Sequence, residues 1–295
     1  MIIVRLNGGL GNQLFQYAAG RSLAIKNNDI LQLDVSGYRN QLSPKQIYRN
    51  LDITDFRITA READSETISR IKNPLGSVSK ILRGIEQKIF SRYYVDWHPE
   101  VLNQSGDTYL DGYFQTERYF QDHKEVILNE LTLIPELAKE TQSYLNNIES
   151  KNCKISLHIR RGDYVEDART SKSHLVCNIN YYKRAIAYME ERFPDLHLFI
   201  FSDDPQWVRE NLMTAVPLTF VSTDKADRNA LRPSQELKLM SKCSHHILSN
   251  SSFSWWGAYL NRSTDKVVLA PNVWNKGPIP QPNILPMGWI PFQVL

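Results

Sequence analysis

Residues 155–164 have the sequence ISLHIRRGDY. Apolar and polar residues alternate here, which predicts a strand over 154–160. Alternation places the three aliphatic side chains on one face of that strand and Ser156, His158 and Arg160 on the other. A strand with one apolar face and one polar face is expected to lie inside a sheet, with its polar groups directed at a site.

Arg160 and Arg161 stand together at the carboxyl end of this strand. The planar fork of an arginine side chain matches the oxygens of a phosphate group and keeps its charge at any physiological pH. The alternative is a surface pair that forms salt bridges with Glu166 and Asp167. The position directly after an apolar strand favours phosphate binding, and two neighbouring arginines suggest a diphosphate.

The rest of the second half alternates strands with helices. Strands are expected at 197–202, 217–222, 245–249 and 266–270, and helices at 180–193, 205–213, 233–243 and 252–261. This is the pattern of a doubly wound α/β domain, in which ligands bind at the carboxyl ends of the strands.

The first half begins in the same way. A strand is expected at 2–6, a glycine-rich turn at 7–12, a helix at 12–27 and a strand at 30–34. Further along, helices are expected at 61–72, 77–90 and 135–149, and strands at 93–96 and 108–113. The polar segment 146–154 suggests a domain boundary near residue 150. We therefore expect an α/β protein with two Rossmann-like domains, 1–150 and 151–295, that face a cleft.

A second motif, Ser202-Asp203-Asp204-Pro205, follows the strand expected at 197–202. Serine and aspartate are good helix caps and proline suits the first helical turn, so capping explains the motif well. A carboxylate could also accept the two N–H donors of guanine. One aspartate can cap the helix while its neighbour binds a base.

The third motif is SNSSFSWWG at residues 249–257. Ser251 and Ser252 precede a predicted helix, where they can cap it or donate to an anion at its N-terminus. Phe253 and Ser254 belong to the same turn. The two tryptophans that follow fall inside the helix and are expected to be core residues.

The glycine-rich turn near the N-terminus contains Gly9, Gly11, Asn12 and Gln13. It lacks the Gly-x-Gly-x-x-Gly spacing of a dinucleotide-binding fingerprint, which disfavours a dehydrogenase. Such a turn allows a ligand to approach the backbone, with Asn12 and Gln13 as polar contacts. It is equally what a tight strand-to-helix connection requires.

Composition excludes several classes of protein. The chain has 295 residues and a formal net charge of +3, so nothing demands a nucleic-acid partner. Its three scattered cysteines form no zinc or disulfide pattern and indicate a reducing, cytoplasmic compartment. No segment is long enough to span a membrane, so contact with one would be peripheral. Neither an Asp-x-Asp motif nor His residues at ligand spacing are present, and no metal is expected.

The four motifs together resemble the bacterial α-1,2-fucosyltransferases. They are HIRRGDY at 158–164, SDDP at 202–205, NSSFSWWGA at 250–258 and RLNGGLGNQLFQYAAG at 5–20. The first resembles the His-x-Arg-Arg-x-Asp signature of α-1,6- and protein O-fucosyltransferases. The resemblance implies a GT-B-like fold, GDP-fucose as donor, and inverting transfer to the 2-hydroxyl of a galactoside without a metal or other cofactor.

The resemblance also implies roles for individual residues. His158 and Arg160 match donor-binding positions, with Arg160 on the β-phosphate, while Asp204 matches the position that holds guanine and Ser251 and Ser252 match phosphate contacts. The expected donor-binding set is His158, Arg160, Arg161, Asp203, Asp204, Ser251, Ser252, Phe253, Ser254, Gly9, Gly11, Asn12 and Gln13.

Inversion in one step asks for a general base near the acceptor hydroxyl. Asp163 is the first candidate, with Glu166 and Asp167 next. The acceptor would be a galactose-containing oligosaccharide or a lipid-linked glycan of surface-polysaccharide synthesis, such as O-antigen, bound on the N-terminal side. The alternatives are a transferase that uses another nucleotide sugar and a non-catalytic protein that binds nucleotides or carbohydrates.

Overall fold

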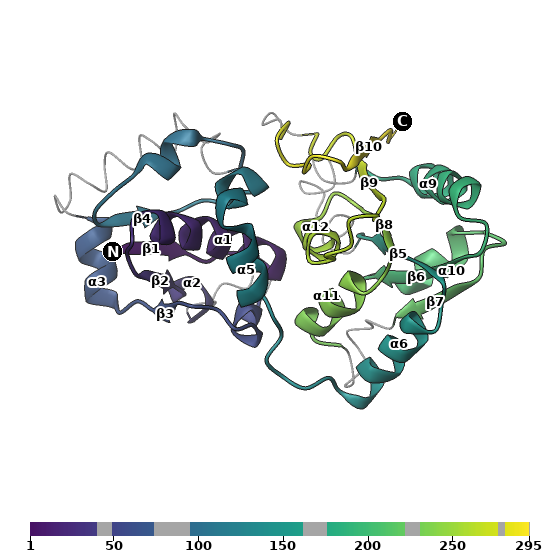
Figure 1. The fold of residues 1–295 in the computed structure, drawn as a ribbon, viewed down its shortest axis with the longest axis horizontal. Coiled ribbons are helices and arrows are strands. Elements are labelled where there is room, and N and C mark those ends of the chain that lie inside the picture. Colours follow the sequence, from purple (N-terminus) through teal and green to yellow (C-terminus); the bar gives the residue numbers. More distant parts are fainter. Residues whose placement is uncertain (40–48, 74–94, 162–175, 222–230, 277–280, 295) are drawn as a thin grey trace. The chain divides into compact units, whose positions relative to one another are not determined.

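The chain folds into two compact units. The computed structural model describes residues 1–39, 49–73, 95–161, 176–221, 231–276 and 281–294. Unit 1 contains Met1–Ile134 and Gln281–Ile284, and unit 2 contains Pro135–Pro280 and Leu285–Leu295. Both can be followed by colour in Figure 1.

Unit 1 is built on a parallel sheet of four strands in the order β3-β2-β1-β4. The strands are β1 (Ile2–Arg5), β2 (Leu31–Asp34), β3 (Arg61–Glu62) and β4 (Thr108–Leu110). The central strand β1 forms because its aliphatic residues are completely buried between layers on both faces. The expected strand at 2–6 is therefore confirmed.

The helices of unit 1 are α1 (Leu10–Lys26), α2 (Ser36–Arg39), α3 (Ser65–Lys72) and α5 (Lys124–Glu130), with 3₁₀ turns η1 (Asp52–Asp55), η3 (Pro99–Asn103), η4 (Glu117–Tyr119) and η5 (Gln121–His123). Helix α3 packs through Ile71 and Ile68 on Ile3 of β1. The long helix α1 contacts β1 and β2 and is almost entirely buried.

A glycine turn connects β1 to α1. Gly8 has a φ of +83°, a conformation that only glycine adopts without strain, and a Cβ there would come within 2.6 Å of the Asn12 side chain. This backbone lets the chain reverse directly from the carboxyl end of β1 into α1. The tight-turn interpretation of the motif is thus correct.

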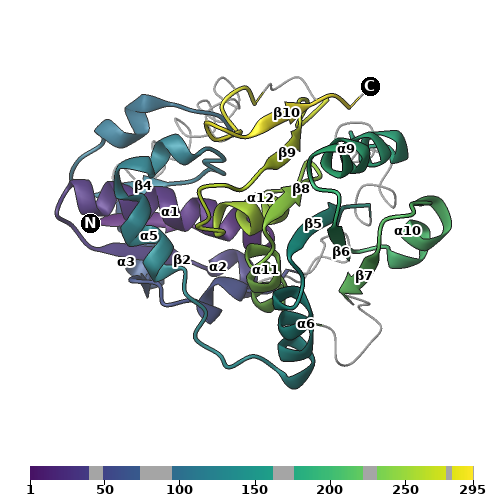
Figure 2. The same cartoon turned by 45° about the vertical axis from the view of Figure 1, so that its right-hand side comes forward.

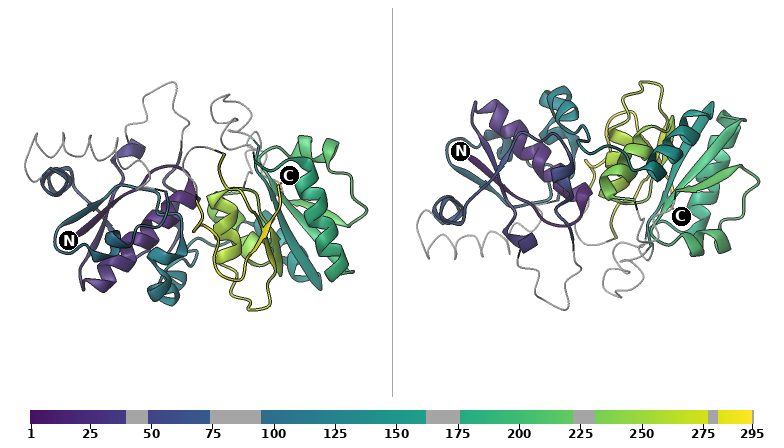
Figure 3. Two further views of the ribbon diagram at one scale, coloured as in Figure 1. Left: turned by 90° about the horizontal axis from the view of Figure 1, so that it is seen from above. Right: turned by 90° about the horizontal axis from the view of Figure 1, so that it is seen from below.

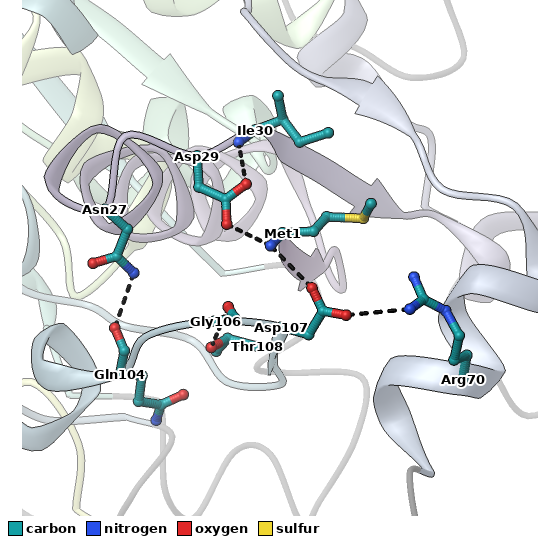
Figure 4. Close-up of polar contacts among 9 residues, drawn as sticks. All are labelled: Met1, Asn27, Asp29, Ile30, Arg70, Gln104, Gly106, Asp107 and Thr108. Atoms are coloured by element: carbon teal, nitrogen blue, oxygen red, sulfur yellow. Dashed lines mark hydrogen bonds and ion pairs between the residues drawn. The ribbon is translucent and has the colours of Figure 1, made fainter.

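The start of β1 is held by two carboxylates from the neighbouring strands' loops. The Met1 ammonium bonds Asp29, which precedes β2, and Asp107, which precedes β4, the latter at 3.1 Å. Figure 4 shows Asp107 also reaching Arg70 of α3. The amino ends of three strands are therefore joined by one set of ion pairs.

Unit 2 contains a parallel sheet of six strands in the order β10-β9-β8-β5-β6-β7, which can be followed across Figure 2. The strands are β5 (Cys153–Ile159), β6 (Leu196–Ser202), β7 (Leu218–Val221), β8 (His245–Ile247), β9 (Val268–Pro271) and β10 (Ile290–Phe292). The five strands expected in this half are all confirmed, and β10 is an addition.

Helices cover both faces of this sheet. They are α6 (Lys139–Glu149), α9 (Ile179–Arg192), α10 (Pro205–Asn211), α11 (Pro233–Ser241) and α12 (Ser252–Tyr259). Figure 3 shows α9 and α10 on one face and α11 and α12 on the other. The aliphatic side of β5 packs in the core with α9, so the predicted alternation along 154–160 is confirmed.

Helices α11 and α12 approach closely. A Cβ on Gly257 of α12 would lie 2.7 Å from the Met240 sulfur of α11, so the position requires glycine. Trp255 and Trp256 are fully buried, as expected for core residues of this helix.

Several expectations for the middle of the chain need correction. The helix expected at 61–72 is split, because residues 61–62 pair with β2 as β3 before α3 begins. Residues 95 and 96 form a turn rather than the end of a strand, and α5 was not expected. The helix expected at 77–90 lies outside the described residues.

The boundary between the units also differs from the one expected near residue 150. The chain passes into unit 2 after Ile134, because α6 packs against α11. A buried hydrogen bond of 2.7 Å from Thr141 of α6 to Gln235 of α11 fixes this contact. The two-domain α/β organisation itself is confirmed.

In the part of the chain that the structure describes, no helix has both the length and the apolar character needed to cross a bilayer.

Candidate functional site

The order of strands in unit 2 brings the second-half motifs together. From β5 the sheet continues through β6 and β7 on one side and through β8, β9 and β10 on the other. The boundary between β5 and β8 is a topological switch point, where parallel sheets bind ligands at their carboxyl ends. The motifs that follow β5, β6 and β8 therefore lie at one edge of one sheet.

Side chains on the polar face of β5 form hydrogen bonds with β8 and with the turn that follows it. His158 is buried, and its Nδ1 lies 2.7 Å from the Ser249 hydroxyl. Ser156 makes the same kind of contact, 2.7 Å from Nδ1 of His246. These bonds fix the imidazole rings, and the ring of His158 lies 5.9 Å from that of Phe253.

Asp203 connects the end of β6 to the arginine pair. One of its oxygens lies 2.9 Å from Nη1 of Arg160, and the other accepts the backbone N–H of Arg161 at 2.8 Å. The Asp203 side chain is only 8% exposed, so this is a largely desolvated ion pair. Losing either partner would leave the other charge uncompensated. Asp203 therefore fixes the position of Arg160 at the strand end.

Arg161 is directed toward α10. Its guanidinium lies 3.7 Å from the ring centre of Trp207, and its Nε is 3.3 Å from Asp204. Stacking and pairing of this kind hold the side chain in one orientation. The alternative bridges to Glu166 and Asp167 fall outside the described residues.

The aspartate that was expected to hold guanine is the one that caps the helix. Asp204, not Asp203, caps α10: its Oδ1 accepts the backbone N–H of Trp207 at 3.1 Å, and Pro205 occupies the first turn. Asp204 is more exposed than Asp203, at 37%. The residue expected to hold guanine is thus already engaged by a helix and an arginine.

The serine turn after β8 opens α12. Ser251 is the cap, and its hydroxyl accepts the backbone N–H of Phe253 at 3.3 Å. Ser254 is buried, and its hydroxyl donates to the carbonyls of Ser249 and Ser251. Ser254 therefore supports the turn from within, whereas Ser251 and Ser252 stand at the helix start.

Glu236 is a residue of this site that the sequence did not single out. It lies in the first turns of α11 and interacts electrostatically with Arg160 and Asp203. Desolvation raises the pKa of its carboxyl to about 8, an effect that Arg160 opposes and Asp203 reinforces. Helices that follow parallel strands start at the carboxyl edge of the sheet, so the expected helix at 233–243 already indicated that its first acid faces the ligand edge.

Unit 1 presents its glycine turn at the carboxyl end of β1. Among the described residues, a Cβ on Gly9 would meet no atom within 4 Å, so they leave this backbone open to a ligand. Asn12 accepts a hydrogen bond of 2.9 Å from Gln115. Gly11 is buried inside α1.

Gln13 was expected to contact a ligand, and its environment argues against that role. It is completely buried, and its amide nitrogen donates to the carbonyls of Gly8 and Asn50 at 3.1 and 2.7 Å. Its oxygen accepts the backbone N–H of Ile53 at 3.0 Å. With both amide donors used by the backbone, Gln13 stabilises the turn.

Comparison with known proteins now identifies the family. The family model described as glycosyl transferase family 11 matches residues 1–291. The chain belongs to glycosyl transferase family 11. This family 11 protein is 32% identical over 285 residues to an α-1,2-colitosyltransferase of Escherichia coli, covering 93% of this chain and 92% of the relative. It is also 32% identical over 291 residues to the O-antigen biosynthesis glycosyltransferase WbnK of Escherichia coli, covering 92% and 94%.

Among solved structures, the fold is similar to that of FUT1 from Arabidopsis thaliana in complex with GDP. The TM-score is 0.54 at 11% identity, and the match covers 91% of this chain and 70% of that one. This likeness agrees with the GT-B-like architecture expected for a family 11 protein.

The candidate general bases of this family 11 protein, Asp163 and Glu166, together with Asp167, lie outside the described residues. Across 1–39, 49–73, 95–161, 176–221, 231–276 and 281–294, no cluster of three His, Cys, Asp or Glu side chains is arranged to hold a metal ion. The charged groups described at the switch point are Arg160, Arg161, Asp203, Asp204 and Glu236.

The buried histidines predict how stability depends on pH. Desolvation, assisted by Arg160, lowers the pKa of His158 to about 3, and burial lowers the pKa of His246 well below its ordinary 6.5. An unfolded chain protonates both below about pH 6.5, whereas the folded protein does not. Each histidine then removes about 1.4 kcal/mol of stability per pH unit. The raised pKa of Glu236 acts in the opposite sense, and the two imidazoles outweigh this one carboxyl only below about pH 6.5.

The expected result is a melting temperature that falls between pH 6 and pH 5, where both histidines of the unfolded chain are mostly protonated. His246→Gln should flatten this slope, and His98→Gln, on a partly exposed histidine of unit 1, should not. Thermal denaturation followed by circular dichroism measures both. A melting temperature that is constant or rises between pH 6 and pH 5 would contradict the burial of these rings.

Proposed function

We propose that this family 11 protein transfers an L-fucosyl group from GDP-fucose to the 2-hydroxyl of a galactoside in an acceptor glycan, with inversion. The observation that carries the proposal is the Arg160–Asp203 pair at the switch point of unit 2. It provides a fixed cation where a parallel sheet binds its ligand. Relatives named galactoside α-(1,2)-fucosyltransferase, 26% identical in gorilla, support the linkage.

The proposed chemistry is stabilisation of a leaving diphosphate. When the sugar leaves GDP, negative charge develops on the β-phosphate. We propose that Arg160, fixed by Asp203, and the N-terminus of α12, with Ser251 and Ser252, stabilise that charge. The sugar carbon passes through an oxocarbenium-like state, as in other glycosyl transfers. Asp163, and next Glu166, remain our candidates for the base that accepts the acceptor proton.

We assign guanine to a different carboxylate from the one the sequence suggested. Both oxygens of Asp204 and both oxygens of Asp203 already accept protein donors. The side chain of Glu236 makes no hydrogen bond with the described residues, and Arg160 acts on it electrostatically. Above its pKa of about 8, or once bound N–H donors favour its ionised form, Glu236 offers the two acceptor oxygens that the N1 and N2 donors of guanine require.

The donor sugar has one specific competitor. Colitose is fucose without its 3-hydroxyl, and an α-1,2-colitosyltransferase is 32% identical to this chain. A site that bonds the 3-hydroxyl rejects an analogue lacking it, so we expect GDP-fucose to react faster by about tenfold or more. Initial rates at equal concentrations of GDP-fucose, GDP-colitose and UDP-galactose test this. Faster transfer from GDP-colitose would contradict the assignment of fucose.

For the acceptor, we propose a galactose-containing oligosaccharide or lipid-linked glycan of the O-antigen type. The name of the relative WbnK, 32% identical over nearly its whole length, supports this class. We place the acceptor on unit 1, where Gly9 leaves the backbone open at the carboxyl end of β1. Turnover of any such acceptor excludes the alternative of a non-catalytic binding protein.

We further propose that transfer needs no metal ion, because arginine and helix N–H groups neutralise the diphosphate. Treatment with EDTA followed by desalting should leave the rate of GDP release unchanged. Adding magnesium or manganese back should change it by less than about twofold. Complete loss of activity that either metal restores would overturn this part of the proposal.

A further inference from the structure

A second charged site lies at the other edge of the unit 2 sheet. A cavity of about 440 Å³ opens where β5 and β8 begin and where α11 and α12 end. Its lining includes Lys154, Lys238, Lys242 and Arg262. Because strands β5 and β8 run in the same direction, this cavity lies at their amino ends, opposite the candidate donor site.

The lining of this cavity carries four cations and no acid. The ammonium groups of Lys154, Lys238 and Lys242 have no hydrogen bond or ion pair with any described residue, and Glu149 of α6 acts on Lys238 only at longer range. Burial and the neighbouring Lys242 together lower the pKa of Lys238. The positive charges of Lys238 and Lys242 therefore repel each other.

The polar groups around the cations are held by the backbone. Asn261 donates to the carbonyl of Cys243 at 2.8 Å and accepts the backbone N–H of Ser263 at 2.8 Å. The N–H of Ser244 bonds the carbonyl of Lys154 at 2.7 Å. These hydrogen bonds connect the backbone segments from which the charged side chains extend into the cavity.

Lysines near helix ends often serve only to complement the helix dipole. At the end of α12 that role is filled by Lys266, which donates to the carbonyls of Ala258, at 2.9 Å, and Asn261. Lys266 is not part of the cavity lining. The three lysines of the lining are further cations beyond what two helix ends need, and a polyanion would neutralise them.

We propose that this cavity binds a phosphate-bearing anion, held by Lys154, Lys238, Lys242 and Arg262. Lysine ammonium groups bind phosphate as compact point charges, and an arginine adds a planar fork. The phosphate could belong to a soluble phosphate ester or to the headgroup of a membrane lipid. The site is separate from the proposed transfer chemistry and does not depend on it.

The test uses inorganic pyrophosphate and the intact protein already saturated with GDP, so that the donor site is occupied. Calorimetric titration compares the wild type with Lys238→Gln/Lys242→Gln. The matched control is Lys139→Gln/Lys183→Gln, two exposed lysines on helices of the same unit outside the cavity. We expect pyrophosphate to bind the cavity variant more weakly by about tenfold or more, with no change in the control.

A second arm distinguishes the sources of phosphate. Co-sedimentation with phosphatidylglycerol vesicles, and with phosphatidylcholine vesicles as the uncharged comparison, is measured for the same three proteins. Vesicle binding that the cavity variant alone loses identifies a lipid headgroup, and pyrophosphate binding without vesicle binding identifies a soluble ester. An unchanged affinity for GDP shows that each variant is folded, and Lys242→Gln alone replaces the double variant if it is not. The proposal is overturned if neither probe distinguishes the cavity variant from its control.

Discussion

Replacing Arg160 by alanine is expected to lower kcat by about a hundred- to a thousandfold. The guanidinium is fixed by Asp203 at the carboxyl end of β5, where charge would develop on the departing diphosphate. An interaction that strengthens in the transition state lowers kcat when it is removed. Arg160→Lys should also fail, because a point charge cannot reproduce the fork. Steady-state release of GDP measures each variant.

The matched control is Arg209→Ala. The Arg209 guanidinium stacks on Phe220 of the edge strand β7 at 3.7 Å, and it belongs to none of the motifs that follow β5, β6 and β8. Its loss should leave kcat within about twofold of the wild type. The melting temperature of Arg160→Ala must be measured as well, since Asp203 loses its partner. Near-normal turnover by a folded Arg160→Ala variant would exclude the phosphate role.

The second large effect concerns recognition of the guanine base of the donor. Glu236→Gln replaces one acceptor oxygen of the carboxylate, which is ionised above about pH 8, with a donor that would then face a guanine N–H. A hydrogen bond to a charged group contributes about 1.5–3 kcal/mol, so GDP should bind roughly ten- to a hundredfold more weakly. ADP and UDP do not offer the same donor pair, and their binding should change little. Calorimetric titration with the three nucleotides at pH 8.5, where the Glu236 carboxylate is ionised, gives the selectivity directly.

Variants of Asp204 are the control for Glu236→Gln, because Asp204 is the other candidate for binding guanine. Asp204→Asn keeps a good helix cap, whereas Asp204→Ala removes it and should cost about 1 kcal/mol of stability. If Glu236 binds guanine, neither change should reduce the preference for GDP over ADP. Loss of that preference in Asp204→Asn, with Glu236→Gln unaffected, would return guanine to the position that family resemblance suggested.

The sequence predicted the sheet of unit 2 well because its signals are local. Alternation along β5, capping residues after β6 and β8, and apolar runs of strand length each lie within a few residues. Strand β10 was not predicted because it has only three residues and contains Pro291. Proline is tolerated in an edge strand, but it weakens the sequence pattern of a strand.

The site was predicted less completely because its details depend on contacts between distant residues. Asp203 and Asp204 have the same capping propensity, and only the pairing of β5 with β6 turns one toward Arg160 and the other toward α10. From the sequence Gln13 was predicted to contact a ligand, but in the structure its side-chain amide bonds the backbone of Asn50 and Ile53. Glu236 lies 76 residues beyond Arg160 in sequence, and the topology brings them together.

The most direct test of the account is the structure of the product. The protein is incubated with GDP-β-L-fucose and a β-galactoside, and the purified disaccharide is examined by NMR. We predict an α-linked fucosyl group on the galactose 2-hydroxyl, which shows both the donor and inversion at the sugar carbon. A fucosyl group on another hydroxyl, a β linkage, or no transfer from GDP-fucose under conditions where another nucleotide sugar reacts would contradict it.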